Sequence, residues 1–398
     1  INTVLKDYHT VVSPVLRKNL VQFLLKQKEV CFDTETTSTD AISAELVGLA
    51  FSYYQNEAFY IPFPAEREKA LEILEDFRSF FESENIVKIG HNLKYDIMVL
   101  HNYGIEVKGE IFDTMLAHYL IEPEMRHGMD NLSAVYLHYQ PISITSLIGK
   151  KGEAQGNMRE VELSRIAEYA AEDADVTFQL KQIFAPLIVE NKFDSLSTQI
   201  ENPLIYVLAD MEESGVKIDT AALGEYSLLL QNEINQVEEI IYNLAGERFN
   251  IGSPKQLGAI LFEKLKLDEK PKKTESGQYA TGEEILSKMA ADHEIARKIL
   301  EYREYQKLKS TYVDALPSMI NPRTGMVHTC FNQAVAATGR LSSTNPNLQN
   351  IPIRTDRGKE IRKAFIPRDK GRVIFSADYS QIELRIMAAF SEDESMIN

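Results

Sequence analysis

Four acidic residues in three short sequence phrases carry the chemistry that this chain suggests. Asp33 and Glu35 lie in VCFDTETT, Asp96 lies in GHNLKYDIMVL, and Asp173 lies in EYAAEDADVT. Each phrase places a carboxylate among apolar residues, where a negative charge is costly unless a positive group meets it. Carboxylate oxygens are the ligands that Mg²⁺ prefers, and two such ions can hold both the attacking and the leaving oxygen of a phosphodiester. The four residues therefore predict hydrolysis of nucleic acid.

The spacing of these residues on regular elements favours a common site. Asp33 and Glu35 are two residues apart at the end of a predicted strand, so both side chains point to one face. Asp96 falls in the first turn of a helix just after a strand end, where site residues of α/β sheets often lie. Tyr169 and Asp173 are neighbours on one helix face, and a phenol there could orient an attacking water. Singly, each residue is more often a cap or a solvated charge, so the prediction depends on their conjunction.

The elements that must position these residues form a mixed α/β pattern in residues 1 to about 190. Runs of β-branched and aromatic residues predict strands at 30–33, 46–53, 58–61, 86–89 and 111–112. Apolar residues at helical spacing predict helices over 93–102, from 114 onward and over 162–189. The first three strands are close in sequence and should form an antiparallel meander. The neighbouring acids are expected to cap, pair or stay solvated: Asp113, Glu172 and Asp175.

The rest of the chain changes character twice. Residues 192–319 read as almost wholly helical, with Gly215 ending one helix and Asp219 capping the next. After a turn at 321–325 the pattern becomes richer in strands and loops.

The phrase RVIFSADYSQIELRIMAAF near residue 398 is a second candidate for metal chemistry. It predicts a strand at 373–375, with Asp378 at its end, and a helix from about 380. A carboxylate at a strand end is again what a metal-held phosphate needs.

Composition bounds the class of protein. The length of 398 residues exceeds one hydrophobic core, so two or three domains are expected, and no apolar run is long enough to span a membrane. Cys31 and Cys330 have no metal-type spacing, which favours a reduced, cytoplasmic protein.

The net charge of -16 disfavours a nucleic-acid partner, but cations can bridge carboxylates to phosphates and residues 354–372 are locally basic. The chain starts with Ile and has no signal segment, so we expect an internal piece of a longer protein.

The three acidic phrases resemble the Exo I, II and III motifs of the proofreading 3′–5′ exonucleases that use four carboxylates and a tyrosine. The resemblance implies a ribonuclease-H-like domain over residues 1–191, with Mg²⁺ as its metal and Mn²⁺ as an alternative. It implies that Asp33, Glu35 and Asp173 bind one ion and that Asp33 and Asp96 serve a second. Tyr169 and Glu35 would position the attacking water.

The resemblance also concerns the substrate strand. Asn92 would touch the substrate. Relatives often carry Leu shortly after the first motif to wedge the terminal base, whereas this chain has Thr39. Ile144 would supply a second apolar contact, and stacking of the terminal base is expected to be weaker.

The phrase that holds Asp378 resembles motif A of the family A DNA polymerases, and ATGRLSSTNPNLQNIP resembles the block that precedes it. The resemblance implies a mainly helical thumb over 192–320 and the start of an incomplete α+β palm over 321–398. Asp378 and the Tyr379 carbonyl would serve polymerase metals, and Glu383 would exclude a ribose 2′-hydroxyl. Ile382 and Arg385 would shape the nucleotide site. Phosphate and minor-groove contacts would come from Lys255, Arg303, Lys307, Arg340, Asn347, Gln349 and Asn350.

The leading hypothesis is a piece of a bacterial-type family A DNA polymerase that trims DNA 3′ ends. In the family the second polymerase carboxylate lies beyond motif A, so we expect this piece not to synthesise DNA, unlike its parent. Expected partners are a single-stranded or frayed 3′ end, a primer-template duplex along the thumb and, for the parent, deoxynucleotides; a monomer away from membranes is expected. The alternatives are a catalytically silent DNA-binding clamp module and a stand-alone 3′–5′ exoribonuclease. The four carboxylates with Tyr169 disfavour the first, and the thumb and motif A phrases disfavour the second.

Overall fold

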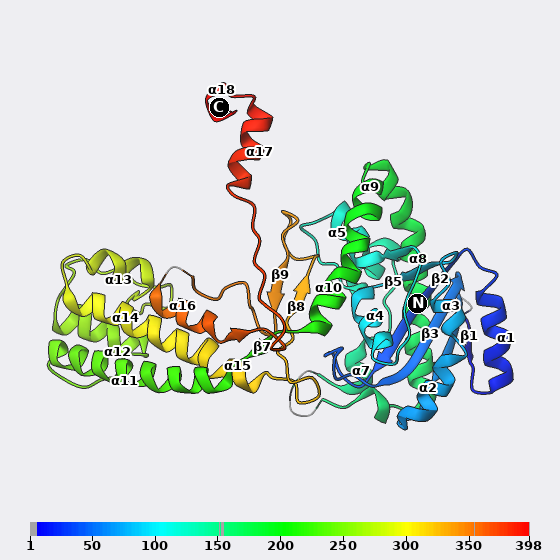
Figure 1. The fold of residues 1–398 in the computed structure, drawn as a ribbon, viewed down its shortest axis with the longest axis horizontal. Coiled ribbons are helices and arrows are strands. Elements are labelled where there is room, and N and C mark those ends of the chain that lie inside the picture. Colours follow the sequence, from blue (N-terminus) through cyan, green and yellow to red (C-terminus); the bar gives the residue numbers. More distant parts are fainter. Residues whose placement is uncertain (1–5, 151, 153–154, 354, 398) are drawn as a thin grey trace. The chain divides into compact units, whose positions relative to one another are not determined.

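The computed structural model describes residues 6–150, 152, 155–353 and 355–397. Their contacts divide the chain into two compact units (Figure 1): the first is 1–215 with 328–349, and the second is 216–327 with 350–398. The segment 192–215 and the later segment 328–349 therefore pack with the predicted α/β domain. The functional division at residues 191 and 320 stays a prediction.

The first unit is built on a six-stranded mixed sheet with the strand order β1-β4-β3-β2-β5-β6. β2, β3 and β4 form an antiparallel meander, whereas β1, β5 and β6 each pair in parallel. The strands are β1 (Asp7–Thr10), β2 (Glu29–Thr36), β3 (Leu46–Tyr54), β4 (Glu57–Pro62), β5 (Val87–Gly90) and β6 (Ile111–Asp113). The five predicted strands and the meander are thus confirmed. β1 was not predicted, because its four residues DYHT bury no side chain and show no apolar alternation.

Helices cover both faces of this sheet. They are α1 (Pro14–Leu24), α2 (Arg67–Glu75), α3 (Arg78–Phe81), α4 (Leu93–His101), α5 (Thr114–Ile121), α6 (Met129–Leu132), α7 (Ile144–Ile148), α8 (Leu163–Glu190), α9 (Asp194–Leu196) and α10 (Asn202–Ser214), with short 3-10 or π turns at Ser133–Leu137, Met158–Glu160 and Ser197–Glu201. The predicted helices correspond to α4, α5 and α8. β8 (Cys330–Asn332) and β9 (Ser342–Thr344) form a small antiparallel pair in the same unit.

Successive residues of β2 point into two different cores, because side chains alternate along a strand. Phe32 packs with residues of α1 to α4, and its ring meets Phe81 edge-on at 5.2 Å between centroids. Cys31 packs instead with Ala167 and Ala170 of α8. By the same alternation, Asp33 and Glu35 lie on the α8 face and Thr34 lies on the α4 face.

Gly48 in β3 makes room for the buried ring of Tyr60 on the neighbouring strand. A Cβ at Gly48 would lie 2.2 Å from ring and hydroxyl atoms of Tyr60, which is only 1% exposed and has no room to retreat. We expect Gly48→Ala to lower the free energy of unfolding by about 1–3 kcal/mol, as for an overpacked core.

Urea unfolding measures this change. The matched control is Gly224→Ala in helix α11 (Thr220–Ala245), where an added Cβ meets nothing within 4 Å. Since alanine is the better helix former, this control should raise the free energy by about 0.5–1 kcal/mol. If both substitutions changed the free energy of unfolding in the same direction, the steric argument would be contradicted.

The second unit is mainly helical and contains α11 (Thr220–Ala245), α12 (Pro254–Gly258), α13 (Glu283–Met289), α14 (Glu294–Leu308), α15 (Ala315–Ser318), α16 (Asp356–Lys363), α17 (Ile382–Ser391) and α18 (Glu394–Ile397), with π turns at Ala259–Lys264 and Lys309–Val313. β7 (Lys217–Ile218) pairs antiparallel with β10 (Phe365–Ile366). The predicted caps are confirmed: Gly215 ends α10 at a φ of 60°, and Asp219 accepts a hydrogen bond from the Ala222 amide at 3.0 Å. No helix of the described residues is long and apolar enough to cross a membrane.

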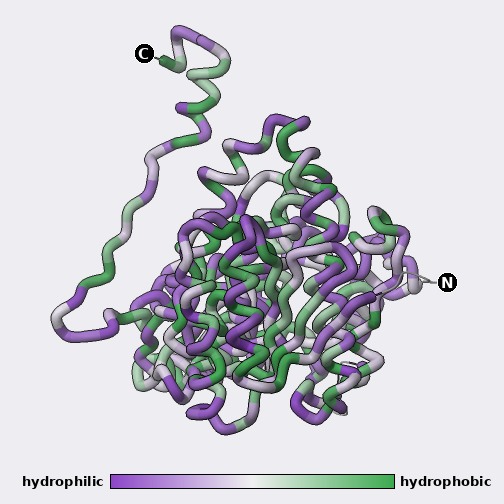
Figure 2. Tube along the Cα trace, turned by 90° about the vertical axis from the view of Figure 1, so that its right-hand side faces the viewer, coloured by the Kyte–Doolittle hydropathy of each residue, from purple (hydrophilic) through white to green (hydrophobic). Residues whose placement is uncertain are grey.

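The predicted strand at 373–375 is wrong. Residues 372–379 have no regular structure, and Val373 and Phe375 are 84% and 86% exposed. Figure 2 shows hydrophobic stretches along this extended segment. A strand is stable only when others pair with it, and no described strand pairs here. The following helix, α17, begins at Ile382.

Candidate active site

Three of the four predicted carboxylates converge where β2 meets α8. One ligand oxygen from each of Asp33, Glu35 and Asp173 lies within 4.8 Å of the other two. The two strand residues share the face that α8 covers, and Asp173 comes from the middle of that helix. The pairing of β2 with β3 shifts register after Glu35, and such bulges often re-aim side chains beside active sites. Within the described residues, this is the only such group of three potential metal ligands.

Asp96 reaches the site from the opposite face of the sheet. It lies in the first turn of α4, which packs against that face, and it is 3% exposed. Its Oδ1 accepts hydrogen bonds from the backbone amide of Thr34 at 3.0 Å and from the Thr34 hydroxyl at 2.6 Å. Thr34 stands between Asp33 and Glu35 on β2, so it ties Asp96 to the same strand end. This arrangement leaves Oδ2 of Asp96 for another ligand.

The electrostatics of the four carboxylates call for a cation. Burial raises the pKa of Asp33, Glu35, Asp96 and Asp173 well above the usual range, and negative neighbours raise it further. For Asp33 the neighbour is Asp173, and for Asp96 it is Asp33. Oε1 of Glu35 is buried and has no hydrogen-bond partner. A buried acceptor without a donor, among further carboxylates, fits a metal ion.

Tyr169 lies one helical turn before Asp173 on α8. Burial raises the pKa of the Tyr169 phenol, and Asp173 and Glu35 raise it further, so the hydroxyl stays protonated and can donate. A hydrogen bond with Tyr169 in turn lowers the pKa of Asp173, although burial dominates. The structure thus groups Asp33, Glu35 and Asp173, places Tyr169 close enough to interact with Asp173, and ties Asp96 to the same strand through Thr34.

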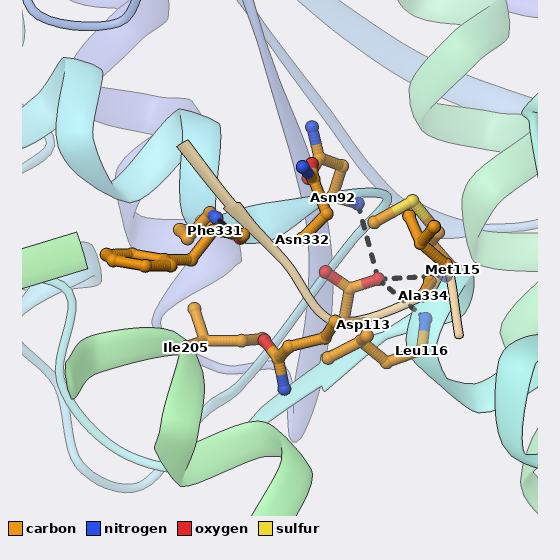
Figure 3. A pocket seen from close by; sticks show the side chains of 11 residues that line it. Asn92, Asp113, Met115, Leu116, Ile205, Phe331, Asn332 and Ala334 are labelled. Carbon is orange, nitrogen blue, oxygen red and sulfur yellow. Dashed lines mark hydrogen bonds between the residues drawn. The ribbon is translucent and has the colours of Figure 1, made fainter. Parts of the chain in front are cut away.

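Asp113 fixes the start of α4 and was predicted only as a cap or pair. Its Oδ1 accepts from the backbone amides of Asn92 at 3.2 Å, Met115 at 2.8 Å and Leu116 at 3.2 Å (Figure 3). Its Oδ2 accepts from the backbone amide of Leu93 at 2.7 Å. One buried carboxylate therefore caps both α4 and α5. Asn92, at the cap of α4, has a left-handed backbone with a φ of 64°. Both residues line a cavity of about 80 Å³ beside residues 331–335.

Removing the Asp113 carboxylate should destabilise the first unit. In Asp113→Ala four backbone amides, two of them buried, lose their acceptor, and two helix caps are lost together. We expect the free energy of unfolding to fall by at least about 2 kcal/mol. Urea unfolding followed by circular dichroism measures the loss.

The control is Asp113→Asn, whose amide oxygen can still accept two or more of these bonds. It should lose clearly less stability than Asp113→Ala. Equal losses in the two variants would show that capping is not the role of Asp113.

The remaining predicted residues are not members of this group of potential metal ligands. Arg303 is held within its own unit, because it donates to the Thr281 carbonyl at 2.6 Å. Oε1 of Gln349 accepts from the Ser343 amide at 3.1 Å, and Oδ1 of Asn347 accepts from the Gln349 amide at 3.1 Å. Exposed side chains are those of Lys255, Lys307, Arg340, Asn347, Gln349, Asn350, Asp378, Tyr379, Ile382, Glu383 and Arg385. Thr39 and Ile144 are exposed as well.

Comparison with known proteins identifies the class. Residues 8–188 match the family model described as 3′-5′ exonuclease, and residues 220–398 match the model of DNA polymerase family A. Residues 220–398 thus belong to DNA polymerase family A, and a region that matches 3′-5′ exonuclease precedes them in the chain.

Individual relatives agree with this assignment. DNA polymerase I of Pseudomonas aeruginosa is 42% identical over 404 residues, and DNA polymerase I of Borreliella burgdorferi is 40% identical over 395; each alignment covers 98% of this chain. The chain spans only 44% and 42% of these two proteins. The solved POL domain of Pol1 from M. smegmatis, in complex with DNA primer-template and dNTP, superposes with a TM-score of 0.82 at 30% identity, over 98% of this chain and 64% of that one.

Proposed function

We propose that the first unit removes nucleotides from DNA 3′ ends by metal-dependent hydrolysis. The convergence of Asp33, Glu35 and Asp173, with Oε1 of Glu35 buried and unpartnered, carries this proposal. Divalent cations bound there would polarise the phosphodiester and stabilise the charge that develops on its oxygens. Because every available ligand is a carboxylate oxygen, Mg²⁺ fits best, with Mn²⁺ as the alternative.

The proposed roles follow the positions of the side chains. Asp33, Glu35 and Asp173 would hold one cation, and Asp33 with Oδ2 of Asp96 would hold the second. The Thr34 hydroxyl keeps Asp96 in this orientation by binding its other oxygen.

The attacking water would be positioned by the protein rather than by the substrate. The protonated hydroxyl of Tyr169 and the carboxylate of Glu35 would hold and orient it for attack on the last phosphodiester. The free 3′ end must reach the buried strand end, so the substrate is a single strand or a frayed end. Asn92, at the start of the helix that carries Asp96, would contact this strand.

The second unit and the segment after it would serve the parent polymerase. We assign residues 1–191 to the exonuclease, 192–320 to the thumb and 321–398 to the start of the palm. The structural match to a polymerase solved with primer-template and dNTP supports this. Duplex phosphates would meet Lys255, Arg303 and Lys307, and the minor groove would meet Arg340, Asn347, Gln349 and Asn350. The nucleotide site would include Asp378, Tyr379, Ile382, Glu383 and Arg385.

The two alternatives have less support. The grouping of Asp33, Glu35 and Asp173, with Asp96 and Tyr169 as neighbours, disfavours a silent DNA-binding module. The family A match over 220–398 disfavours a stand-alone exoribonuclease. Template-directed synthesis by the whole protein, its monomeric state and its cytoplasmic location stay predictions.

A trimming assay tests the proposed function. A DNA single strand labelled at its 5′ end is incubated with the protein and Mg²⁺, and the products are separated by length. A ladder that shortens from the 3′ end, and that disappears with EDTA, is expected. An RNA strand of the same sequence should be cut much more slowly. Absence of any ladder would refute the proposal, and equal cutting of RNA would revive the exoribonuclease alternative.

A further inference from the structure

Glu172 is a buried carboxylate on α8 that the proposed hydrolysis does not use. It precedes Asp173 but leaves the helix in another direction, and it is 1% exposed. Three donors meet it: Lys6 Nζ at 2.5 Å, the Tyr139 hydroxyl, and the backbone amide of Ile142 at 2.5 Å. Two of these donors belong to the short stretch that leads into α7. Glu172 therefore anchors this stretch to the helix that carries Asp173.

The anchored stretch packs on the same apolar cluster as Tyr169 of the candidate active site. We call residues 139–148 the flanking segment. Leu147 and Ile148 of α7 pack in the same apolar cluster as Tyr169. Arg165 of α8 donates to the Ser146 carbonyl at 2.8 Å and holds the far end. Ile144, at the start of α7, is 43% exposed and so is available to a ligand.

The flanking segment depends on these anchors because it has little stability of its own. α7 has five residues and buries none of them completely. A helix of that length is unstable in isolation, since forming its first turn costs more than its few hydrogen bonds return. Loss of Glu172 would leave a half-buried hydroxyl and a backbone amide without an acceptor, which favours release of the segment.

We propose that Glu172 is a positioning residue that holds the flanking segment against α8, so that the 3′-terminal nucleotide is bound beside Tyr169. The inference rests on the proposed exonuclease function and adds a determinant of substrate binding outside the metal ligands. Glu172 acts through the segment and touches neither the cations nor the reacting atoms. Its loss should weaken substrate binding more than it slows the chemical step.

Asp175 offers a matched control on the same helix. It is 2% exposed and also accepts three hydrogen bonds, from the Tyr8 hydroxyl at 2.8 Å, the Asn56 amide at 2.8 Å and Gln179 at 2.9 Å. These donors tie α8 to the edge strand β1, to the turn between β3 and β4 and to its own next turn, and none belongs to the flanking segment. Loss of Asp175 should therefore cost stability without altering the binding of the terminal nucleotide.

The experiment compares Glu172→Ala with Asp175→Ala in the trimming assay with a labelled DNA single strand and Mg²⁺. Glu172→Ala should raise KM about tenfold with kcat within about twofold, which indicates lost binding rather than lost chemistry. Asp175→Ala should leave both constants within about twofold of the parent. Equal KM values in the two variants, or a fall in kcat at unchanged KM in Glu172→Ala, would overturn the inference.

Two milder substitutions test the same contacts with a smaller risk of misfolding. Tyr139→Phe removes one donor to Glu172, and Tyr8→Phe removes one donor to Asp175. KM should rise in the first variant alone. Limited trypsin digestion gives a readout without catalysis: cleavage after Lys150 should be faster in Tyr139→Phe than in Tyr8→Phe. Equal cleavage rates would overturn the inference, whereas a parent protein that does not trim would refute only the proposed function.

Discussion

Asp173→Ala is expected to lower the rate of 3′ trimming by about 10³-fold or more, because metal ions contribute several kcal/mol of transition-state stabilisation and each 1.36 kcal/mol is a factor of ten. Asp173 is the only one of the three clustered ligands that comes from α8. Without it the two strand carboxylates alone cannot enclose the cation. Single-turnover trimming of a labelled DNA strand with saturating Mg²⁺ measures the loss.

Glu168→Ala is the control for this variant. Glu168 lies on the same helix, next to Tyr169, but its side chain is exposed. Its removal takes the same charge from the same helix without touching the cluster, so trimming should stay within about twofold of the parent. If Asp173→Ala trims as fast as Glu168→Ala, the assignment of the active site is wrong.

Metal-free protein is expected to lose stability as the pH rises from the ordinary carboxylate range toward the raised pKa of the four buried carboxylates, and Mg²⁺ is expected to restore it. Burial and like charges raise the pKa of Asp33, Glu35, Asp96 and Asp173 in the folded state. Between the unfolded and the folded pKa the folded protein binds more protons than the unfolded chain. Stability therefore falls with rising pH across that window.

Mg²⁺ binds the ionised carboxylates, so its stabilising effect should grow with pH. At a concentration 100 times Kd it would add about 2.7 kcal/mol, or a rise in Tm of about 5–10 °C. Thermal unfolding with Mg²⁺ or EDTA measures this. His91 and His118 have the opposite effect at lower pH, because burial lowers the pKa of each to about 4. Above pH 7 both are neutral in either state and do not interfere.

Asp33→Asn separates the carboxylates from other titrating groups. It removes one like charge and one ligand, so the metal-free variant should be more stable than the parent in the pH window between the unfolded and the folded pKa, and gain little from Mg²⁺. A metal-free parent that becomes more stable as the pH rises across that window, or an equal Mg²⁺ effect in both proteins, would contradict the electrostatic account.

The sequence predicted the sheet and the grouping of Asp33, Glu35 and Asp173 well because both follow from local patterns. Period-two spacing placed Asp33 and Glu35 on one face, and helical spacing paired Tyr169 with Asp173; the structure has both arrangements. Strands β2 to β6 were all predicted from short apolar runs. Such patterns can be recognised without knowing which residues far away in the sequence the element contacts.

Features that depend on distant partners were missed. Nothing near Asp113 shows that its carboxylate caps the helix that begins twenty residues earlier at Leu93. In the sequence AAEDAD, nothing distinguishes Glu172 from the neighbouring acidic residues. Its role becomes visible only from the hydrogen bonds that Lys6 and Tyr139 donate to it. The strand predicted at 373–375 failed for the same reason, because an apolar run becomes a strand only when another pairs with it.

Because of Thr34, the arrangement of the candidate active site depends on the register of β2. Asp33 and Glu35 face α8 while Thr34 between them faces Asp96, so β2 serves both halves of the site at once. A slip of β2 by one residue against β3 would send both acids to the wrong face and turn Thr34 away from Asp96. No half-formed sheet could then hold all four carboxylates together. During refolding, trimming activity should therefore recover at the same rate as β2 pairs with its neighbouring strands. The recovered activity would measure the fraction of molecules in which β2 has the correct register.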